Sequence, residues 1–296
     1  MGQRDKKIAL AILIALTIAL AGKLCLDKDD SVWAFVVPSD TTKTNTTTEN
    51  VTSIEMKNLR GLPFDDERLL YYTMGLIIPP SDRNVPYVLK EMNKYDYSWD
   101  GIVPTVIQML KNRTNGFFVE CGALDGEVAS NTLTLERFFN WTGLLVEASP
   151  KELKLLNSKN RKAWVAPTCM SLNTTPQMIT FHEDWVLGKV VGTKETDVKS
   201  ETKSGYVDLL CLPFNTLMTS LNRTKIDFFS LDVEGFEFEI LKTIDFKKFE
   251  FDLITLEHKH TGKNHDLIVP FMDRNGYSLN LTTAMDYFFF NKNLIF

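Results

Sequence analysis

Segments that read as strands alternate with segments that read as helices from about Gly101 to Phe296, and this alternation limits the fold more than any other feature. Apolar runs at 116–120, 142–147 and 226–232 predict buried strands. Strands that alternate with helices form a mostly parallel sheet that is covered by helices on both faces. The sequence therefore predicts an α/β fold for this part of the chain.

Further segments fit the same alternation. Helices are predicted at 128–139, from Pro150, at 236–244 and at 266–275, and strands at 163–169 and 252–257. Two closing strands within 277–291 have no helix between them, which predicts an antiparallel edge. An irregular insertion at 176–212 resembles a β-hairpin with a polar tip at 193–204.

The N-terminus predicts entry into the secretory pathway. Arg4, Lys6 and Lys7 precede an apolar run at 8–22, whose 15 residues would span about 22 Å as a helix, against roughly 30 Å for a bilayer core. The segment 1–26 is either a signal anchor, with the body in the lumen, or a signal peptide cleaved after Ala19-Leu20-Ala21. Both alternatives make the body luminal or extracellular.

The next two segments are less regular. Residues 27–57 are rich in threonine and lack periodicity, which predicts a flexible stalk. Residues 58–99 mix short helical patches with turns and form an approach segment before the body at 100–296.

Seven N-x-Thr sequons support a luminal body, since chance alone predicts roughly three in a chain of this composition. The asparagines are Asn45, Asn50, Asn112, Asn140, Asn173, Asn222 and Asn280. The alternative is that a threonine-rich sequence forms such triplets by accident. The formal net charge of −5 gives no basic surface for nucleic acid, so no nucleic-acid partner is expected.

A glycine-containing turn follows the first predicted strand. Glu120-Cys121-Gly122-Ala123-Leu124-Asp125-Gly126-Glu127 lies where a strand passes into a helix, and glycines there allow backbone to approach a ligand. Glu147 ends the second strand, where nucleotide-binding folds place an acid for ribose hydroxyls. The structural alternative is a tight turn and a glutamate that caps a helix.

Acidic and histidine side chains follow two later strands. Asp232 and Glu234 could hold Mg²⁺, or one of them could cap the helix that follows. Glu257 and His258 end the fifth strand of the alternation, and either could act as a base. The alternative for His258 is an ordinary surface residue.

Two sequence blocks carry a family resemblance. The block at 117–150 (FFVECGALDGEVASNTLTLERFFNWTGLLVEASP) and the block at 226–241 (IDFFSLDVEGFEFEIL) resemble the FkbM-type family of S-adenosylmethionine-dependent methyltransferases. The segments Ser130-Asn131-Thr132, 160–164 and 168–171 are similar to the animal Star branch of that family. The resemblance covers roughly residues 75–292.

The resemblance implies a Rossmann-like methyltransferase fold with a seven-stranded sheet and S-adenosylmethionine as cofactor. Glu120, Gly122, Ala123, Asp125 and Gly126 would surround the methionine end of the cofactor, and Glu147 would hold its ribose. Asp232 would face the transferred methyl group and the acceptor. The Star-like positions and a luminal compartment together imply a disulfide between Cys169 and Cys211.

Two functions are compatible with this resemblance. One is a Star-like, single-pass membrane protein that helps a membrane-tethered growth-factor precursor, a ligand of the EGF receptor, move from the endoplasmic reticulum to the Golgi and endosomes. It would reside in these membranes or the plasma membrane. The other is an active O-methyltransferase for a hydroxylated acceptor such as a glycan. The anchor, the stalk and the Star-like residues favour the trafficking role. The intact glycine turn does not exclude it, because a fold can persist after its chemistry is lost.

Overall fold

The computed structural model describes residues 56–182, 189–194 and 205–294. Residues Val51–Phe296 form one compact unit, so the approach segment belongs to the same unit as the body. Ten strands are described: β1 Phe117–Cys121, β2 Thr142–Glu147, β3 Trp164–Pro167, β4 Gln177–His182, β5 Lys189–Lys194, β6 Tyr206–Cys211, β7 Lys225–Leu231, β8 Glu250–Glu257, β9 Tyr277–Thr282 and β10 Asp286–Asn291.

Seven α-helices and two short 3₁₀ helices connect or precede these strands. The α-helices are α2 Glu67–Leu76, α3 Ile102–Met109, α4 Leu133–Phe138, α5 Pro150–Asn157, α6 Phe214–Ser220, α7 Glu237–Thr243 and α8 His265–Arg274. The 3₁₀ helices are η1 Met56–Leu59 and η3 Gly262–Asn264. No helix in these described ranges is long and apolar enough to cross a membrane. The predicted anchor lies outside them, as does the predicted stalk apart from residues 56 and 57, which begin η1.

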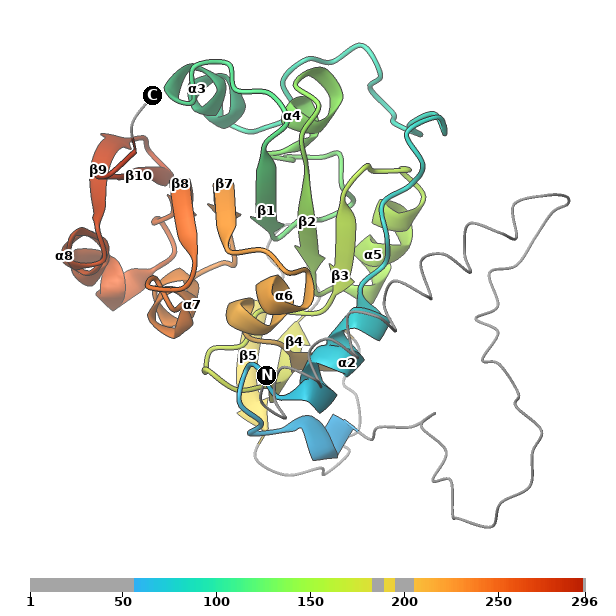
Figure 1. The fold of residues 1–296 in the computed structure, drawn as a ribbon, viewed down its shortest axis with the longest axis vertical. Coiled ribbons are helices and arrows are strands. Elements are labelled where there is room, and N and C mark those ends of the chain that lie inside the picture. Colours follow the sequence, from blue (N-terminus) through green and yellow to red (C-terminus); the bar gives the residue numbers. More distant parts are fainter. Residues whose placement is uncertain (1–55, 183–188, 195–204, 295–296) are drawn as a thin grey trace, which may run out of the picture. The chain divides into compact units, whose positions relative to one another are not determined.

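The central sheet has seven strands in the order β3-β2-β1-β7-β8-β10-β9 (Figure 1). β1 pairs in parallel with β2 and with β7, and β7 pairs in parallel with β8. β10 pairs antiparallel with both β8 and β9, which confirms the predicted antiparallel edge. The predicted α/β fold with a mostly parallel seven-stranded sheet is confirmed.

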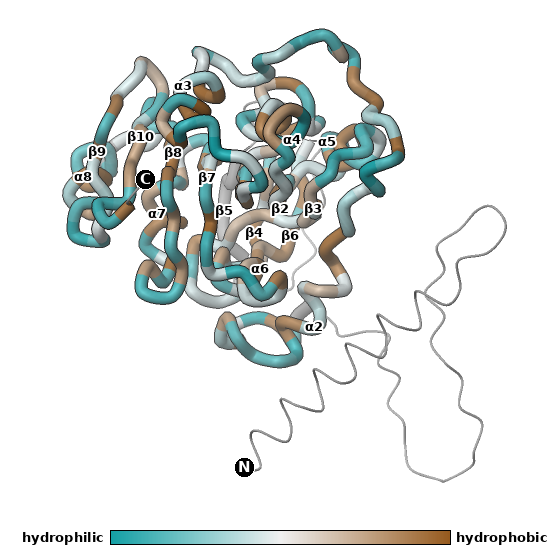
Figure 2. Tube along the Cα trace, turned by 45° about the horizontal axis from the view of Figure 1, so that its top comes forward, coloured by the Kyte–Doolittle hydropathy of each residue, from teal (hydrophilic) through white to brown (hydrophobic). Residues whose placement is uncertain are grey.

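Helices cover both faces of this sheet, as its hydrophobic pattern requires. In β1, Phe117, Val119 and Cys121 belong to one core, with apolar residues of α2, α6, α7 and α8. Phe118 belongs to a second core on the opposite face, with residues of α3, α4 and α5. Because successive side chains of a strand point to opposite faces, a strand buried on both sides has to be apolar throughout. In Figure 2 the peripheral turns are largely teal, whereas brown positions gather where elements pack.

The helix predicted at 128–139 is shorter than expected, because α4 begins only at Leu133. Glu120 explains the difference. Its buried carboxylate accepts hydrogen bonds from the Asn131 backbone N–H (2.6 Å) and the Ser130 hydroxyl (3.1 Å). These bonds hold the preceding residues in a loop, and Ala129 has a left-handed φ of 55° that no α-helix contains. A tertiary hydrogen-bond network therefore overrides the local helical pattern.

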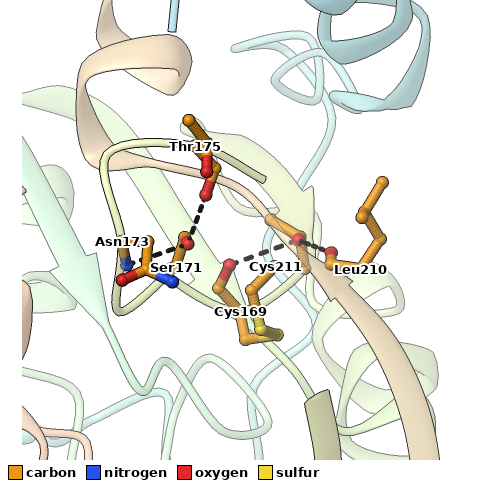
Figure 3. Close-up of a disulfide and its surroundings, with 7 residues drawn as sticks. Cys169, Ser171, Asn173, Thr175, Leu210 and Cys211 are labelled. Atoms are coloured by element: carbon orange, nitrogen blue, oxygen red, sulfur yellow. Dashed lines mark hydrogen bonds between the residues drawn. A yellow bond between two sulfur atoms is a disulfide. The ribbon is translucent and has the colours of Figure 1, made fainter. Parts of the chain in front are cut away.

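The insertion forms a separate three-stranded antiparallel sheet in the order β5-β4-β6. The predicted hairpin with its tip at 193–204 would pair β5 with β6, but each of these two strands pairs with β4 instead, because β4 lies between them. The expected disulfide joins Cys169 to Cys211, so it links the segment after β3 to the end of β6 (Figure 3).

Replacing Glu120 with alanine should destabilise the fold by about 3 kcal/mol or more, because buried donors would lose their acceptor and the nearby Arg161 would lose an opposite charge. Chemical denaturation of Glu120→Ala measures this loss. The exposed Glu91 provides a matched control, and Glu91→Ala should change the free energy of unfolding by less than about 0.5 kcal/mol. Equal effects of the two variants would contradict this account.

Candidate functional site

A cavity of about 490 Å³ opens at the carboxyl ends of the central strands. Cys121 of β1 and Glu147 of β2 line it from one side, and Asp232 and Glu257, at the ends of β7 and β8, line it from the other. β1 lies between β2 and β7 in the sheet, so the chain order reverses at this position. In open α/β sheets, ligands bind at such a switch point.

Gly122 allows the tips of β1 and β7 to meet. It has a φ of 88°, and a Cβ atom at this position would lie 2.2 Å from the backbone oxygen of Asp232. The Asp232 backbone N–H donates to the carbonyl of Cys121 (3.2 Å). A larger residue at 122 would push the two strand ends apart, so glycine is required where the cavity begins.

Glu147 is fixed at the end of β2 by two backbone donors. Its carboxylate accepts hydrogen bonds from the N–H of Leu124 (2.8 Å) and from that of Ser149 (2.7 Å). Burial raises the pKa of Glu147 to about 7, although these hydrogen bonds oppose the shift. Each carboxylate oxygen can accept more than one hydrogen bond, so Glu147 can still bind hydroxyl groups in the cavity.

The other predicted cofactor residues lie behind the cavity wall. Glu120 and Asp125 are buried, and their carboxylates accept hydrogen bonds from nearby residues of the same chain. Asp125 accepts from the N–H groups of Glu127 and Val128. Ala123 is in the core that contains α3 and α4, and Gly126 packs against Leu156 of α5. These four residues shape the turn, whereas Gly122 and Glu147 line the cavity itself.

Carboxyl groups gather at the β7 and β8 end of the cavity. Burial and the nearby Glu234 raise the pKa of Asp232 to about 8. Burial and the charge of Asp232 raise the pKa of Glu257 to about 9. Burial raises the pKa of Asp286, next to β8 on β10, to about 6. A concentration of acidic groups in one enclosed space favours a ligand with positive charge.

The structure separates the two histidines that follow β8. The predicted base His258 does not line the cavity: its ring stacks on Tyr287, with centroids 4.1 Å apart, and its Nε2 lies 3.2 Å from the carbonyl oxygen of Thr283. His260 does line the cavity. Its Nδ1 lies 2.8 Å from Glu234 and 3.1 Å from Glu257. His260 is not predicted from the sequence, because nothing in Glu-His-Lys-His indicates which of the two imidazole rings points into the cavity.

The carboxylates also form two groups with the spacing of metal ligands. Glu234, Glu257 and His260 form one, and Asp232, Glu237 and Glu257 form the other. The predicted Mg²⁺ ligands Asp232 and Glu234 therefore belong to different groups. The capping role considered for Asp232 or Glu234 is not observed, because α7 has no side-chain cap. Glu237, the first residue of α7, accepts from the N–H groups at 233 and 235 and so holds the turn before the helix.

Apolar side chains line the opposite, β3 end of the cavity. Met170 and Leu172 follow β3, and Phe181 comes from β4 of the separate sheet. Trp99, which precedes α3, borders the other, acidic end, where the charge of its neighbour Asp100 acts on Asp286, and 55% of its surface is exposed. The cavity thus has an acidic end and an apolar end, with Glu147 between them.

The raised carboxyl pKa values predict that the protein is less stable at alkaline pH. The buried Glu257 and, to a lesser degree, the more exposed Asp232 hold protons more tightly when folded than when unfolded, so they favour the folded state at low pH. This contribution is lost as the pH rises through their folded pKa values. The melting temperature should therefore fall between about pH 6 and pH 9.

Substituting Glu257 with glutamine should reduce this fall, because one ionisation is removed. Glu250→Gln is the control, since Glu250 lies exposed at the other end of β8. Melting curves recorded across the pH range test the prediction. A wild-type protein that gains stability toward pH 9 would contradict it.

Comparisons with known proteins give one family match. The description of that family is "Methyltransferase FkbM domain", and its model matches residues 120–279. Comparison with curated proteins gave no match.

Solved structures are similar at low identity. The methyltransferase FkbM from Methylobacillus flagellatus KT is 15% identical, with 60% of this chain and 44% of that chain covered and a TM-score of 0.39. This chain thus spans less than half the length of that protein. The precorrin-6y C5,15-methyltransferase from Geobacter metallireducens GS-15 is 11% identical, with 71% and 94% covered and a TM-score of 0.34.

A third similar structure is TYW2 from M. jannaschii in complex with AdoMet, which is 12% identical, with 69% and 82% covered and a TM-score of 0.27.

The family match itself spans more than half of the sequence. This chain therefore belongs to the family of proteins with an FkbM methyltransferase domain.

Proposed function

We propose that this protein binds S-adenosylmethionine in the cavity and transfers its methyl group to a hydroxylated acceptor. The observation that carries the proposal is the arrangement of Gly122, Glu147 and Asp232 around one cavity at the switch point of the sheet. Membership of a methyltransferase family supports the same reaction class.

Each part of the cofactor has a suitable environment along the cavity. Glu147 would accept hydrogen bonds from the ribose hydroxyls, as its place at the end of β2 suggests. The turn at Gly122 lets the methionine part approach the backbone. Asp232 and Glu257 would stabilise the positive sulfonium, since both line the cavity and a bound cation would favour their ionised forms. The bound cofactor supplies an electrophilic methyl group.

The acceptor would enter beside the acidic end. Transfer of a methyl group depends mainly on alignment of the acceptor oxygen, and the hydroxyl proton must pass to a base. Glu257 is suited to this role, because a bound cation would favour its ionised form. His260 contacts Glu257 and would share the proton. The exposed ring of Trp99 would provide an apolar platform for an acceptor such as a sugar.

A Mg²⁺ ion at Asp232 and Glu234 has less support than the cofactor. The two side chains face different neighbours, so an ion would have to use one of the two groups that share Glu257. Carboxylate oxygens are suitable ligands for Mg²⁺ in either group.

Glu147→Ala should weaken the binding of S-adenosylmethionine at least about tenfold, because the ribose would lose a charged acceptor. Calorimetry with the purified protein measures this. Glu250→Ala is the control, since Glu250 is exposed and lies at the far end of β8, and it should bind like the wild type. If the wild type binds no cofactor even at about millimolar concentration, the enzymatic proposal fails.

We also propose that the body is luminal and N-glycosylated. The five sequon asparagines in the described residues are all exposed: Asn112, Asn140, Asn173, Asn222 and Asn280. Three of them shortly precede β1, β2 and β7, so they lie at the edge of the sheet opposite the cavity. Glycans at these three positions would leave the cavity open. Asn45 and Asn50 lie outside the described residues.

Treatment of the cell-expressed protein with an N-glycosidase should therefore increase its electrophoretic mobility. Asn112→Gln, Asn140→Gln and Asn222→Gln should each remove one glycan without changing the affinity for S-adenosylmethionine, because these sites are remote from the cavity. No shift with any form of the protein would contradict the luminal location.

A trafficking role is the second candidate. The apolar N-terminal segment and the Star-like sequence positions support a membrane protein that escorts a membrane-tethered growth-factor precursor through the secretory pathway. Depletion of the protein should then retain this precursor in the endoplasmic reticulum, and the two should co-precipitate. The role would be independent of catalysis if Glu147→Ala restored export in depleted cells.

A further inference from the structure

The apolar end of the cavity is built partly by a sheet that is separate from the central one. Phe181 of β4 lines the cavity and is 8% exposed. Cys169 and Met170, which follow β3, line the same end. The insertion thus supplies part of the wall of the central cavity, although its strands pair only with one another.

The position of this wall relative to Glu147 indicates which part of the cofactor it faces. Glu147 ends β2, and Asp232 follows β7 on the far side of β1. If the ribose binds at Glu147 and the methyl group at Asp232, the adenine must extend past β2 toward β3. The side chains there are Met170 and Phe181, and apolar and aromatic groups of this kind suit a flat aromatic ring.

The wall is attached to the central sheet by a disulfide and by hydrogen bonds around it (Figure 3). The disulfide joins Cys169, just after β3, to Cys211 at the end of β6. Around it, the N–H of Leu212 donates to the carbonyl of Cys169 (2.9 Å), and the Thr168 hydroxyl donates to the carbonyl of Leu210 (2.7 Å). The disulfide is the covalent part of this attachment.

The hydrophobic cluster around the disulfide is small, and apart from it the inserted sheet reaches the main core through Leu210 of β6 and Met178 of β4. Cys169, Cys211 and Ile179 of β4 form a hydrophobic cluster of their own, and Ala148 and Leu209 pack against it. Ala148 directly follows Glu147 and also lines the cavity. A core of this size contributes little hydrophobic free energy, and small cores commonly depend on disulfides. Loss of the bond would therefore loosen β4 relative to β2 and β3.

We propose that the Cys169–Cys211 disulfide positions the adenine-binding wall of the cavity, so that the affinity for S-adenosylmethionine depends on the redox state of this bond. This inference rests on the proposed function. Reduction breaks the S–S bond: a dithiol donates two electrons and two protons, two cysteine thiols form, and the dithiol closes to a cyclic disulfide. Cofactor binding is then strong in an oxidising compartment and weak in a reducing one.

The test compares cofactor binding by the full-length protein before and after reduction. Calorimetry with S-adenosylmethionine is performed on the oxidised protein and on protein treated with dithiothreitol, and the free thiols are counted. We expect the dissociation constant to increase at least about tenfold after reduction. The oxidised Cys169→Ser/Cys211→Ser double variant should reproduce this increase, because it lacks the bond without any reductant.

Phe181→Ala separates an effect on the wall from an effect elsewhere. In the oxidised protein, Phe181→Ala should weaken the binding of S-adenosylmethionine. Reduction of this variant should then increase the dissociation constant by less than about threefold, because the substitution and the reduction act on the same wall. Thr180→Ala is the matched control. The neighbouring Thr180 bonds to Asp208 of β6 and does not line the cavity, so its loss should leave the affinity unchanged.

Several outcomes would overturn the inference. Unchanged affinity in a protein whose bond is fully reduced would do so directly. Circular dichroism shows whether reduction unfolds the domain. If it does, the affinity of the oxidised Phe181→Ala variant becomes the test, and an affinity equal to that of the wild type would refute the role of the wall. If the oxidised wild type does not bind S-adenosylmethionine at all, the proposed function is refuted, and the role of the disulfide is refuted with it.

Discussion

A buried carboxylate near the carboxyl end of β1 holds several parts of this domain together. Glu120 is 2% exposed, and burial raises its pKa while the charge of Arg161 and its hydrogen bonds oppose that shift. It binds the loop that carries Ser130, Asn131 and Thr132. Arg161 in turn forms an ion pair with Glu136 of α4 (3.0 Å). One acidic side chain thereby fixes the turn, the start of α4 and the chain before β3, and the cavity depends on all three.

The same network explains why the cavity can remain open and acidic. Asn131, which lines it, is held by Glu120 through its backbone and by Ser230 of β7 through its side chain. Asn131 is therefore held in place by the protein itself, without a ligand. Carboxyl groups that would repel one another in an open site can be kept close in such a frame, and a positive ligand would relieve their repulsion. This is the physical basis for expecting a sulfonium cofactor.

The local sequence pattern predicts the structure correctly where a single strand or turn determines it. β1 and β2 appear where the apolar runs predict them, since both are buried on both faces and bounded by turns. The helix after the turn was predicted too long, because a helical pattern cannot reveal that Glu120 will bind the loop before it. Glu257 and His258 are both candidate bases at the end of β8, but packing on Tyr287 turns the His258 ring away, whereas Glu257 and His260 line the cavity.

The sequence alone determined the order of strands and helices, the glycine at the tip of β1 and the acid at the end of β2, because periodicity and turn chemistry act over a few residues. Only the tertiary structure brought Glu147, Asp232 and Glu257 to one cavity. These residues are far apart in the chain, and they meet because parallel strands place their carboxyl ends at one edge of a sheet. It was also the tertiary structure that placed Phe181 of the inserted sheet at the same cavity, since the disulfide and its small core fix that sheet beside β3.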